Sequence, residues 1–452
     1  MKFSIQKSYK AMMLTPAIFG LGVLAMGSPA CADEVSDLKA QLKALQQRIE
    51  VLEKRPVETQ VVTATGEKVA PAKPAKKGYF VIPGTETSVK IGGYAKLDAI
   101  YNDVSAGDNS AGDQLFLPST IPLDNTNPDD NQTVLHARQS RFNVGTTTDT
   151  AYGKLNTFFE GDFFGGSNAA GASASSANVD FRIRHAYGEL GKFLAGQTWS
   201  TFEIMDSLPD TLDFGGPAAQ TFMRQGQIRW TEPFAWGSLQ FAVEDPNAVF
   251  DDNTSSTADD QTDDDHFADL IGRANFKNEF GSYSVAVMAR ELSADKNGTT
   301  IDDSAWGGAI TFGGKVPTFG KDDLRFQFNY GNALGRYMTT KFKDAEYNTT
   351  TNEVETFDQW GGFLAYRHYW IDNLRSNLVY SYGAADNDQA VLGTTAYNAA
   401  NKEFQSVHAN LIWSPVPQVD LGIEYLYGYR EIESGADGEL NRIQFSATYN
   451  FF

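Results

Sequence analysis

The chain has 452 residues, a formal net charge of −20 and a mean hydropathy of −0.36. So acidic a chain argues against a nucleic-acid partner, because nucleic acids favour basic surfaces. A single cysteine, Cys31, excludes a framework of intramolecular disulfides. These values leave an exported or membrane-associated protein open.

The first 32 residues have the pattern of a secretory signal peptide. Three lysines precede an apolar run, 11–26, that is too short to span a bilayer as a helix. Ala30-Cys31-Ala32 then supplies a cleavage site of the small-x-small type. We therefore expect 1–32 to be removed on export, which leaves no cysteine. The alternative is a lipoprotein acylated at Cys31, although Ser28-Pro29-Ala30 fits a lipidation site poorly.

A heptad pattern occupies 33–55. Its apolar residues step alternately by three and four: Val35, Leu38, Leu42, Leu45, Ile49 and Leu52. This spacing is typical of an α-helical coiled coil. A helix of about 20 residues is marginal alone in water, so we expect this periplasmic segment to associate with copies of itself. The alternative is one amphipathic helix that packs on its own domain.

A flexible linker is predicted at 56–78. The segment is rich in Ala, Pro, Lys and Thr and has no periodicity. Because it separates the heptads from the rest of the chain, it favours the coiled coil over packing on the same domain.

From 79 to 452 the apolar residues recur with a period of two. The segment 89–101 alternates over 13 residues, longer than a usual globular strand, and a tilted membrane strand needs about 9–11 residues. Comparable segments lie at 134–147, 153–164, 180–190, 192–200, 224–232, 237–245, 267–277, 280–292, 304–315, 324–331, 357–370, 374–382, 406–413, 420–428 and 442–451. The total of sixteen is even, as in bacterial outer-membrane barrels.

The connections between these segments differ in length. Short turns such as 148–151 alternate with long polar loops such as 102–132, and a barrel has its short turns on one rim and its long loops on the other. The loop 251–265 holds seven aspartates and no basic residue. We interpret it as a solvated loop in preference to a site for calcium or for ions that bridge lipopolysaccharide.

The alternation fits a membrane barrel better than a soluble sandwich. Lipid offers no water to backbone groups, and a closed sheet pairs all of them between strands. Only the lipid face must be apolar, so the average composition stays hydrophilic. We therefore predict an all-β fold for 79–452, a 16-stranded antiparallel transmembrane β-barrel in the bacterial outer membrane. The last strand, 442–451, is expected to pair with the first.

Three stretches resemble known outer-membrane proteins. The segments 196–217 and 224–230 resemble the fifth strand, the inward-folded third loop and the sixth strand of trimeric general porins. The last strand resembles the signal that the barrel-assembly machinery reads, with Tyr449 and Phe451 at the usual spacing and Phe452 as one extra residue. Together with the coiled coil and linker, the chain resembles the DcaP-type trimeric porins, a dicarboxylate-specific family.

This resemblance implies a homotrimer with a periplasmic coiled coil and a loop folded inward at about 200–223. It also implies passive uptake of small anionic solutes such as dicarboxylates and phthalates. The expected partners are copies of the chain, outer-membrane lipid and lipopolysaccharide, the barrel-assembly machinery and the solutes.

Selectivity in a porin comes from pore width and lumen charge. A lipid-facing arginine costs about 2–4 kcal/mol at mid-membrane, so inward placement is favoured, and an inward arginine can bind a carboxylate through two hydrogen bonds. The candidate pore-lining and substrate-binding residues are Arg182, Arg184, Arg229, Arg325, Arg141, Arg273, Arg290, Arg367 and Lys96. The first four are the preferred contacts. In the plainer interpretation, these arginines pair with loop acids and only hold the loop.

The inward loop carries four acids that could narrow the pore and set a transverse field: Glu203, Asp206, Asp210 and Asp213.

Other functions fit the sequence less well. It contains no G-x-S-x-G, no H-E-x-x-H and no Cys/His metal spacing, so we expect no enzyme, catalytic residue, metal or cofactor. A trimeric adhesin or structural protein would carry a longer stalk than these heptads, which extend about 30 Å. A porin for sugars, phosphate or general small solutes remains an alternative, although Phe158, Phe363 and Tyr369 make a scattered aromatic track.

Overall fold

The computed structural model describes residues 78–106, 111–165, 180–248, 250–251, 266–295, 302–348 and 350–451. The predicted signal peptide, coiled coil and nearly all of the linker lie outside the described residues, as does most of the acidic loop 251–265. No helix within the described ranges is long and apolar enough to cross a membrane.

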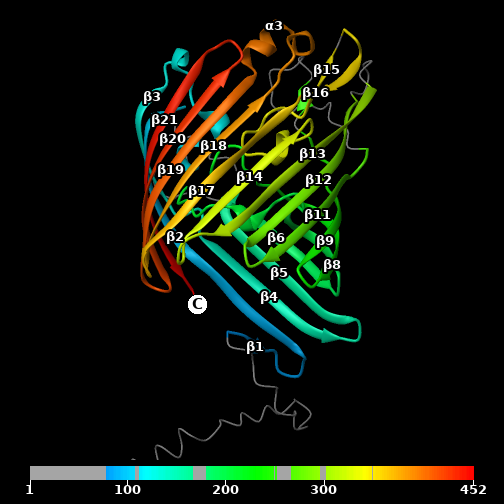
Figure 1. Ribbon diagram of the computed structural model, residues 1–452, viewed down its shortest axis with the longest axis vertical. Helices are drawn as coiled ribbons and strands as arrows, with labels where there is room; N and C mark the ends of the chain where they lie inside the picture. The colour runs from blue at the N-terminus through cyan, green and yellow to red at the C-terminus, as the bar shows by residue number, and fades with distance from the viewer. Residues whose placement is uncertain are drawn as a thin grey trace, which may run out of the picture. The chain divides into compact units, whose positions relative to one another are not determined.

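The described strands form a closed antiparallel barrel (Figure 1). The continuous sheet has 18 strands; β1 is a two-residue addition to β2, and β3 and β4 are two parts of one wall strand, which leaves 16 wall strands. The predicted barrel is therefore confirmed. The strands are β1 (Phe80–Val81), β2 (Thr87–Ser105), β3 (Asp129–His136), β4 (Arg141–Thr150), β5 (Gly153–Gly165), β6 (Asp180–Leu190), β7 (Phe193–Trp199), β8 (Arg224–Phe234), β9 (Gly237–Glu244), β11 (Asp269–Asn278), β12 (Gly281–Asp295), β13 (Asp302–Pro317), β14 (Asp323–Gly331), β17 (Gln359–Ile371), β18 (Leu374–Ala385), β19 (Asn401–Val416), β20 (Val419–Ile432) and β21 (Asp437–Asn450).

The barrel closes between its first and last wall strands. β2 pairs with β21 from Tyr94 opposite Asn450 to Asn102 opposite Arg442. The Phe451 amide extends the pairing by donating to the Gly93 carbonyl at 3.0 Å. Closure gives the backbone groups of both strands partners, as lipid requires. The aromatic end of the chain is therefore part of the wall.

The predicted strand 134–147 is interrupted in the structure. β2 pairs with β3 through its second half and with β4 through its first half. At the junction Gly93 has a φ of 137°, and a Cβ there would lie 2.1 Å from the Arg141 carbonyl oxygen. The alternating sequence pattern predicts one continuous strand across 137–140, but this local irregularity breaks the strand there. Arg138 turns toward the lumen and donates to Gln114 Oε1 at 2.8 Å.

The two faces of the wall differ as a membrane barrel requires. On β14, Phe328 and Tyr330 are about half exposed on the outside, whereas Gln327 and Asn329 are buried on the inside. Apolar side chains thus face lipid and polar side chains face the lumen.

The two rims differ in their connections. One rim has tight turns, for example between β4 and β5 and between β11 and β12, and the C-terminus lies there (Figure 1). The other rim carries the long loops, with helix α3 (Gln389–Ala399) and a small sheet of β10 (Phe250–Asp251), β15 (Ala345–Asn348) and β16 (Glu353–Thr356). Short turns mark the periplasmic rim of such barrels.

Much of the buried apolar cluster lies inside the barrel. It joins wall residues to side chains of three connecting segments: 111–128, which includes α2 (Ala111–Gln114), then 200–223, and 332–344. Phe116, Phe202 and Tyr337 represent these segments, and each is at most 1% exposed. The lumen is therefore narrowed by folded chain.

Candidate functional site

Loop 3, defined as 200–223, connects β7 to β8 through the interior of the barrel. Side chains of distant wall strands hold its backbone: Asn329 of β14 donates to the Ala219 carbonyl at 2.9 Å, and Asn410 of β19 donates to the Asp210 carbonyl at 2.9 Å. Loop 3 therefore crosses the lumen and reaches the opposite wall.

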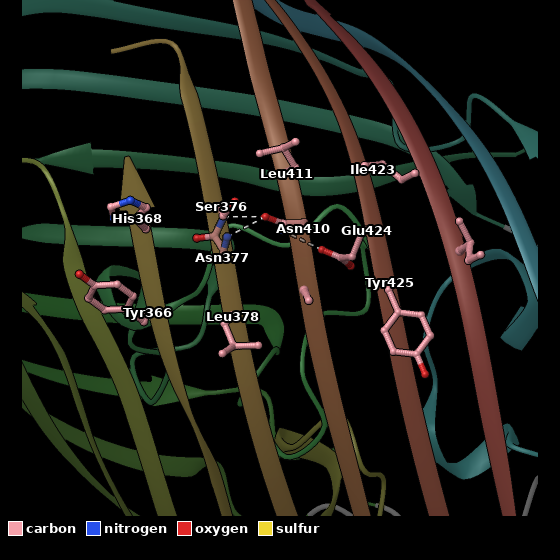
Figure 2. A pocket seen from close by; sticks show the side chains of 12 residues that line it. Tyr366, His368, Ser376, Asn377, Leu378, Asn410, Leu411, Ile423, Glu424 and Tyr425 are labelled. Carbon is pink, nitrogen blue, oxygen red and sulfur yellow. Dashed lines mark hydrogen bonds between the residues drawn. The ribbon is translucent and has the colours of Figure 1, made fainter. Parts of the chain in front are cut away.

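Glu424 of β20 is the main acceptor for the tip of loop 3. Its carboxylate accepts the Leu212 amide at 2.8 Å and the Asp213 amide at 3.2 Å. Figure 2 shows how Asn410 connects Glu424 to Asn377 across three neighbouring strands, with Asn410 donating to Glu424 at 2.9 Å. This network fixes the position of the tip.

A hollow of about 500 Å³ lies at these strands. Figure 2 shows the side chains that line it. Its lining includes the outward side chains Leu378, Leu411, Ile423 and Tyr425, which are exposed on the lipid face. This apolar hollow faces lipid and is therefore not a path for water-soluble solutes.

Loop 3 also packs very closely on β17 and β18. A Cβ on Gly361 or Gly383 would lie 2.6 or 2.7 Å from the Ala219 Cβ. Both glycines therefore allow the loop to rest directly on the wall.

Arginines gather on the wall between the β3–β4 junction and the start of β8. We call this group the arginine–aromatic wall: Arg138, Arg141, Arg182, Arg184 and Arg224, with the rings of Tyr94, Phe164, Trp199, Phe214 and Phe222. Two carboxylates of β5, Glu160 and Asp162, lie among the guanidiniums. Five positive charges against two negative charges leave an excess of three.

The carboxylates orient two of the arginines. Arg182 binds Asp162 through two hydrogen bonds of 3.0 and 2.9 Å. Arg184 donates to Glu160 at 2.9 Å and to the same Asp162 at 2.8 Å. Asp162 is completely buried and serves both arginines, so neither guanidinium can swing freely.

Phe214 of loop 3 lies against the arginines. Its ring centroid is 5.4 to 6.0 Å from the guanidinium carbons of Arg141, Arg182 and Arg184, within the range of cation–π attraction. The ring also stacks on Phe164 at 5.0 Å. Loop 3 thus contributes an aromatic face to a basic wall.

Members of this wall differ in their access to solute. The side chain of Arg182 is 35% exposed and that of Arg141 is 19% exposed, whereas that of Arg184 is 1% exposed. Arg182 and Arg141 are therefore accessible from the lumen. Arg184 acts from behind them as fixed positive charge.

The other predicted basic residues are distributed around the lumen. Arg325 and Arg367 share Asp323, and Arg325 also donates to the Leu208 carbonyl of loop 3. Lys96 is buried and donates to the Leu212 carbonyl at 2.8 Å. These contacts match the plainer interpretation, in which cations hold the loop.

Arg229 and Arg273 lie on inward positions of β8 and β11. Arg273 donates to the Glu203 carbonyl of loop 3. Within the described residues, the Nε atoms of both arginines are buried without a hydrogen-bond partner.

Arg290 is a correction. We expected it to line the pore, but its side chain is completely buried between Asp269 at 3.0 Å and Asp344 at 2.9 Å. It also donates to the Ala333 carbonyl at 3.1 Å. Arg290 therefore holds segment 332–344 against the wall and is not available to solute.

The four acids of loop 3 have different environments. Asp213 is buried against Arg442 at 2.6 Å, and Asp210 pairs with Arg375 at 2.7 Å. Glu203 is 1% exposed, and burial raises the pKa of its carboxyl to about 8. Asp206 is exposed. The expectation that all four face the pore is therefore wrong for Glu203 and Asp213.

Sequence reasoning missed Arg224, Trp199, Phe214 and Phe222 as site residues. Arg224 opens β8 opposite Trp199, the last residue of β7, and its parity is opposite to that of the inward Arg229. The two phenylalanines lie in loop 3, where strand alternation carries no information.

A closed 16-stranded barrel with a loop folded into a charged lumen defines the class of outer-membrane porins. A family model, the DcaP outer membrane protein, matches residues 24–451. The chain belongs to the DcaP outer membrane protein family. Its localisation in the bacterial outer membrane follows from the family and the barrel.

Solved structures agree on the fold. The crystal structure of the outer membrane channel DcaP of Acinetobacter baumannii is 22% identical and has a TM-score of 0.69, covering 81% of this chain and 97% of that one. An anion-selective porin from Comamonas acidovorans is 13% identical with a TM-score of 0.50, covering 81% of this chain and 100% of that one. The comparison with curated proteins finds no match.

Proposed function

We propose that this porin is a passive channel for small anionic solutes, with dicarboxylates as the preferred class, and that it performs no bond chemistry. The observation that carries the proposal is the excess of three positive charges on the arginine–aromatic wall, with Arg182 and Arg141 partly exposed. Membership of the family also supports this proposal, because the resemblance described above implies the uptake of dicarboxylates.

The geometry of the wall suits diffusion. A channel must attract its solute without holding it too tightly to leave. Asp162 and Glu160 already occupy part of the hydrogen-bonding capacity of Arg182 and Arg184. An incoming carboxylate therefore competes for these guanidiniums instead of meeting fully free cations.

We further propose that the channel is a homotrimer, associated through barrel walls and the predicted coiled coil. The fold supports this assembly, because the third loop and the 16-stranded wall are those of trimeric porins. Light scattering in detergent would test it, and a monomer would overturn it.

The main test is a reversal potential in planar bilayers under a salt gradient. We expect the wild-type channel to prefer anions and the double variant Arg141→Gln/Arg182→Gln to lose much of that preference. Phe159→Ala, on the lipid face of β5, is the matched control and should keep it. A cation-preferring wild-type channel would overturn the proposal.

A competition experiment separates dicarboxylates from the alternative solutes. Succinate or phthalate should interrupt the chloride current in single channels more often than a neutral sugar at the same concentration. If the neutral sugar interrupts the current more often, the aromatic rings act as a sugar track and the alternative function is favoured.

A further inference from the structure

A cavity with basic residues in its lining lies on the short-turn side of loop 3, away from the arginine–aromatic wall. Its volume is about 240 Å³, which corresponds to roughly eight waters at about 30 Å³ each. Loop residues 204–206 form one side, and β11 and β12 form the other. We call it the Lys277 pocket after the basic lining residue beside the turn between β11 and β12.

The register of the strands extends this pocket along the wall. Lys277 of β11 lies opposite Ser282 of β12, which lies opposite Lys315 of β13, which lies opposite Arg325 of β14. Directly opposed residues of an antiparallel pair point to the same face of the sheet. Lys277, Lys315 and Arg325 therefore form a basic row at one level.

This row faces the lumen near the periplasmic rim. Two residues further up, Ser284 is buried inside the barrel and donates to Asn275 at 2.7 Å, so this side of both strands is the inner one. Lys277 and Ser282 flank the turn that joins β11 to β12. The row thus lies where solutes leave for the periplasm.

The donors in the pocket are largely uncommitted. Arg273 Nε and Ser282 Oγ are buried without hydrogen-bond partners in the described part of the chain. Neither Lys277 nor Lys315 forms an ion pair with a described residue, whereas Lys192 and Lys321, in other turns of the same rim, do. These groups can therefore accept an external anion.

One carboxylate, Asp206 of loop 3, also lines the pocket. It is exposed and interacts electrostatically with Arg273, although no salt bridge within 4.0 Å joins it to a described cation. Among the residues that line the pocket, the two cations Arg273 and Lys277 and the one carboxylate of Asp206 give a net charge of plus one. With Lys315 alongside, the excess is two.

We propose that the Lys277 pocket is a second binding station for small carboxylate anions, on the periplasmic side of loop 3. The inference rests on the proposed function, because it assigns a further site to the same anion path. Arg273 and Lys277 supply the charge, and Ser282 supplies a hydroxyl donor. An anion released by the arginine–aromatic wall moves to this station before it leaves the barrel.

The test compares entry of succinate from each side of oriented single channels. In Lys277→Gln/Lys315→Gln, we expect the entry rate from the short-turn side to fall by about tenfold at low salt, and the rate from the long-loop side to stay close to wild type. The matched control is Lys192→Gln/Lys321→Gln, which removes two charges from exposed pairs of the same rim. It should behave like wild type.

A second variant adds charge instead of removing it. Ser282→Asp places a carboxylate in the pocket and removes no existing contact, so it should also lower entry from the short-turn side. Heat-modifiable mobility on gels checks that each variant is folded.

The outcomes separate the two proposals. An anion-selective wild type with both Lys277→Gln/Lys315→Gln and Ser282→Asp unchanged overturns the second station alone. Equal losses in the lysine double variant and its control also overturn it, because they show a general rim effect. A cation-selective wild type overturns both proposals.

Discussion

Arg442 donates to Asp213 at 2.6 Å, and both side chains are at most 1% exposed. The contact joins the last wall strand to the tip of loop 3. Asp213 also accepts the backbone amides of Phe116 and Gly215 at 2.8 Å each. One carboxylate thus connects the strand that closes the barrel, loop 3 and segment 111–128.

We predict that Asp213→Asn destabilises loop 3. Removing one partner of a buried ion pair costs about 3–5 kcal/mol, because the remaining charge stays buried. The amide would also direct N–H groups toward Arg442. Unfolding in urea should shift to lower concentration, and the single-channel current should become noisier as the loop moves.

The control for this variant is Lys321→Gln. Lys321 pairs with Asp372 at 2.8 Å, but both side chains are largely exposed, so water and salt screen the pair and its loss should change stability little. If the two variants unfold at the same urea concentration, Asp213 does not hold the loop as described.

Phe214→Ala should weaken anion preference without removing a charge. The ring contacts three guanidiniums, and each cation–π contact contributes about 0.5–2 kcal/mol. Without the ring, Arg141 and Arg182 become more mobile and the lumen widens beside them. We expect higher conductance and a lower anion-to-cation permeability ratio, measured by reversal potential. An unchanged ratio would show that the ring only fills space.

Gly383→Ala should displace loop 3 from the wall. The new Cβ would lie 2.7 Å from the Ala219 Cβ, closer than side chains tolerate. The matched control is Gly226→Ala on β8, where a Cβ meets no atom within 4 Å. Single-channel conductance should change in the first variant and remain at the wild-type value in the second. Equal conductance in both would contradict the close packing of the loop.

The strands could be predicted from the sequence because lipid imposes a simple rule. Each wall strand must alternate, so the inward placement of Arg325 also places Gln327 and Asn329 inward and Phe328 and Tyr330 outward. The rule fails where hydrogen bonding departs from regular pairing. The break between β3 and β4 depends on Gly93, which reads as an ordinary small residue in an alternating segment.

The site was less predictable because loops do not follow this rule. Alternation places Arg290 inward, but it cannot show that Asp344, 54 residues later, covers it. It also says nothing about Phe214, whose position depends on contacts between loop 3 and the far wall. Inward placement therefore does not establish access to solute. Arg182 and Arg290 both face inward, but the side chain of Arg182 is 35% exposed and that of Arg290 is completely buried.

Glu203 should give the protein a pH-dependent stability. Burial raises the pKa of its carboxyl from 4.5 to about 8, so the folded state binds this proton more tightly than the unfolded state. The resulting stabilisation is fully present below about pH 4.5 and is lost as the pH rises toward about 8. Wild-type protein should therefore unfold at lower urea concentration as the pH rises through this window.

Glu203→Gln isolates this contribution, because an amide resembles the protonated carboxyl and does not titrate. The variant should lose part of the pH dependence and exceed wild type in stability at pH 9. Asp206→Asn, on the same loop but exposed, is the control and should keep the wild-type slope. Parallel curves for wild type and Glu203→Gln would mean that this carboxyl titrates alike in the folded and unfolded chains, and its burial against Arg273 would then have no energetic consequence.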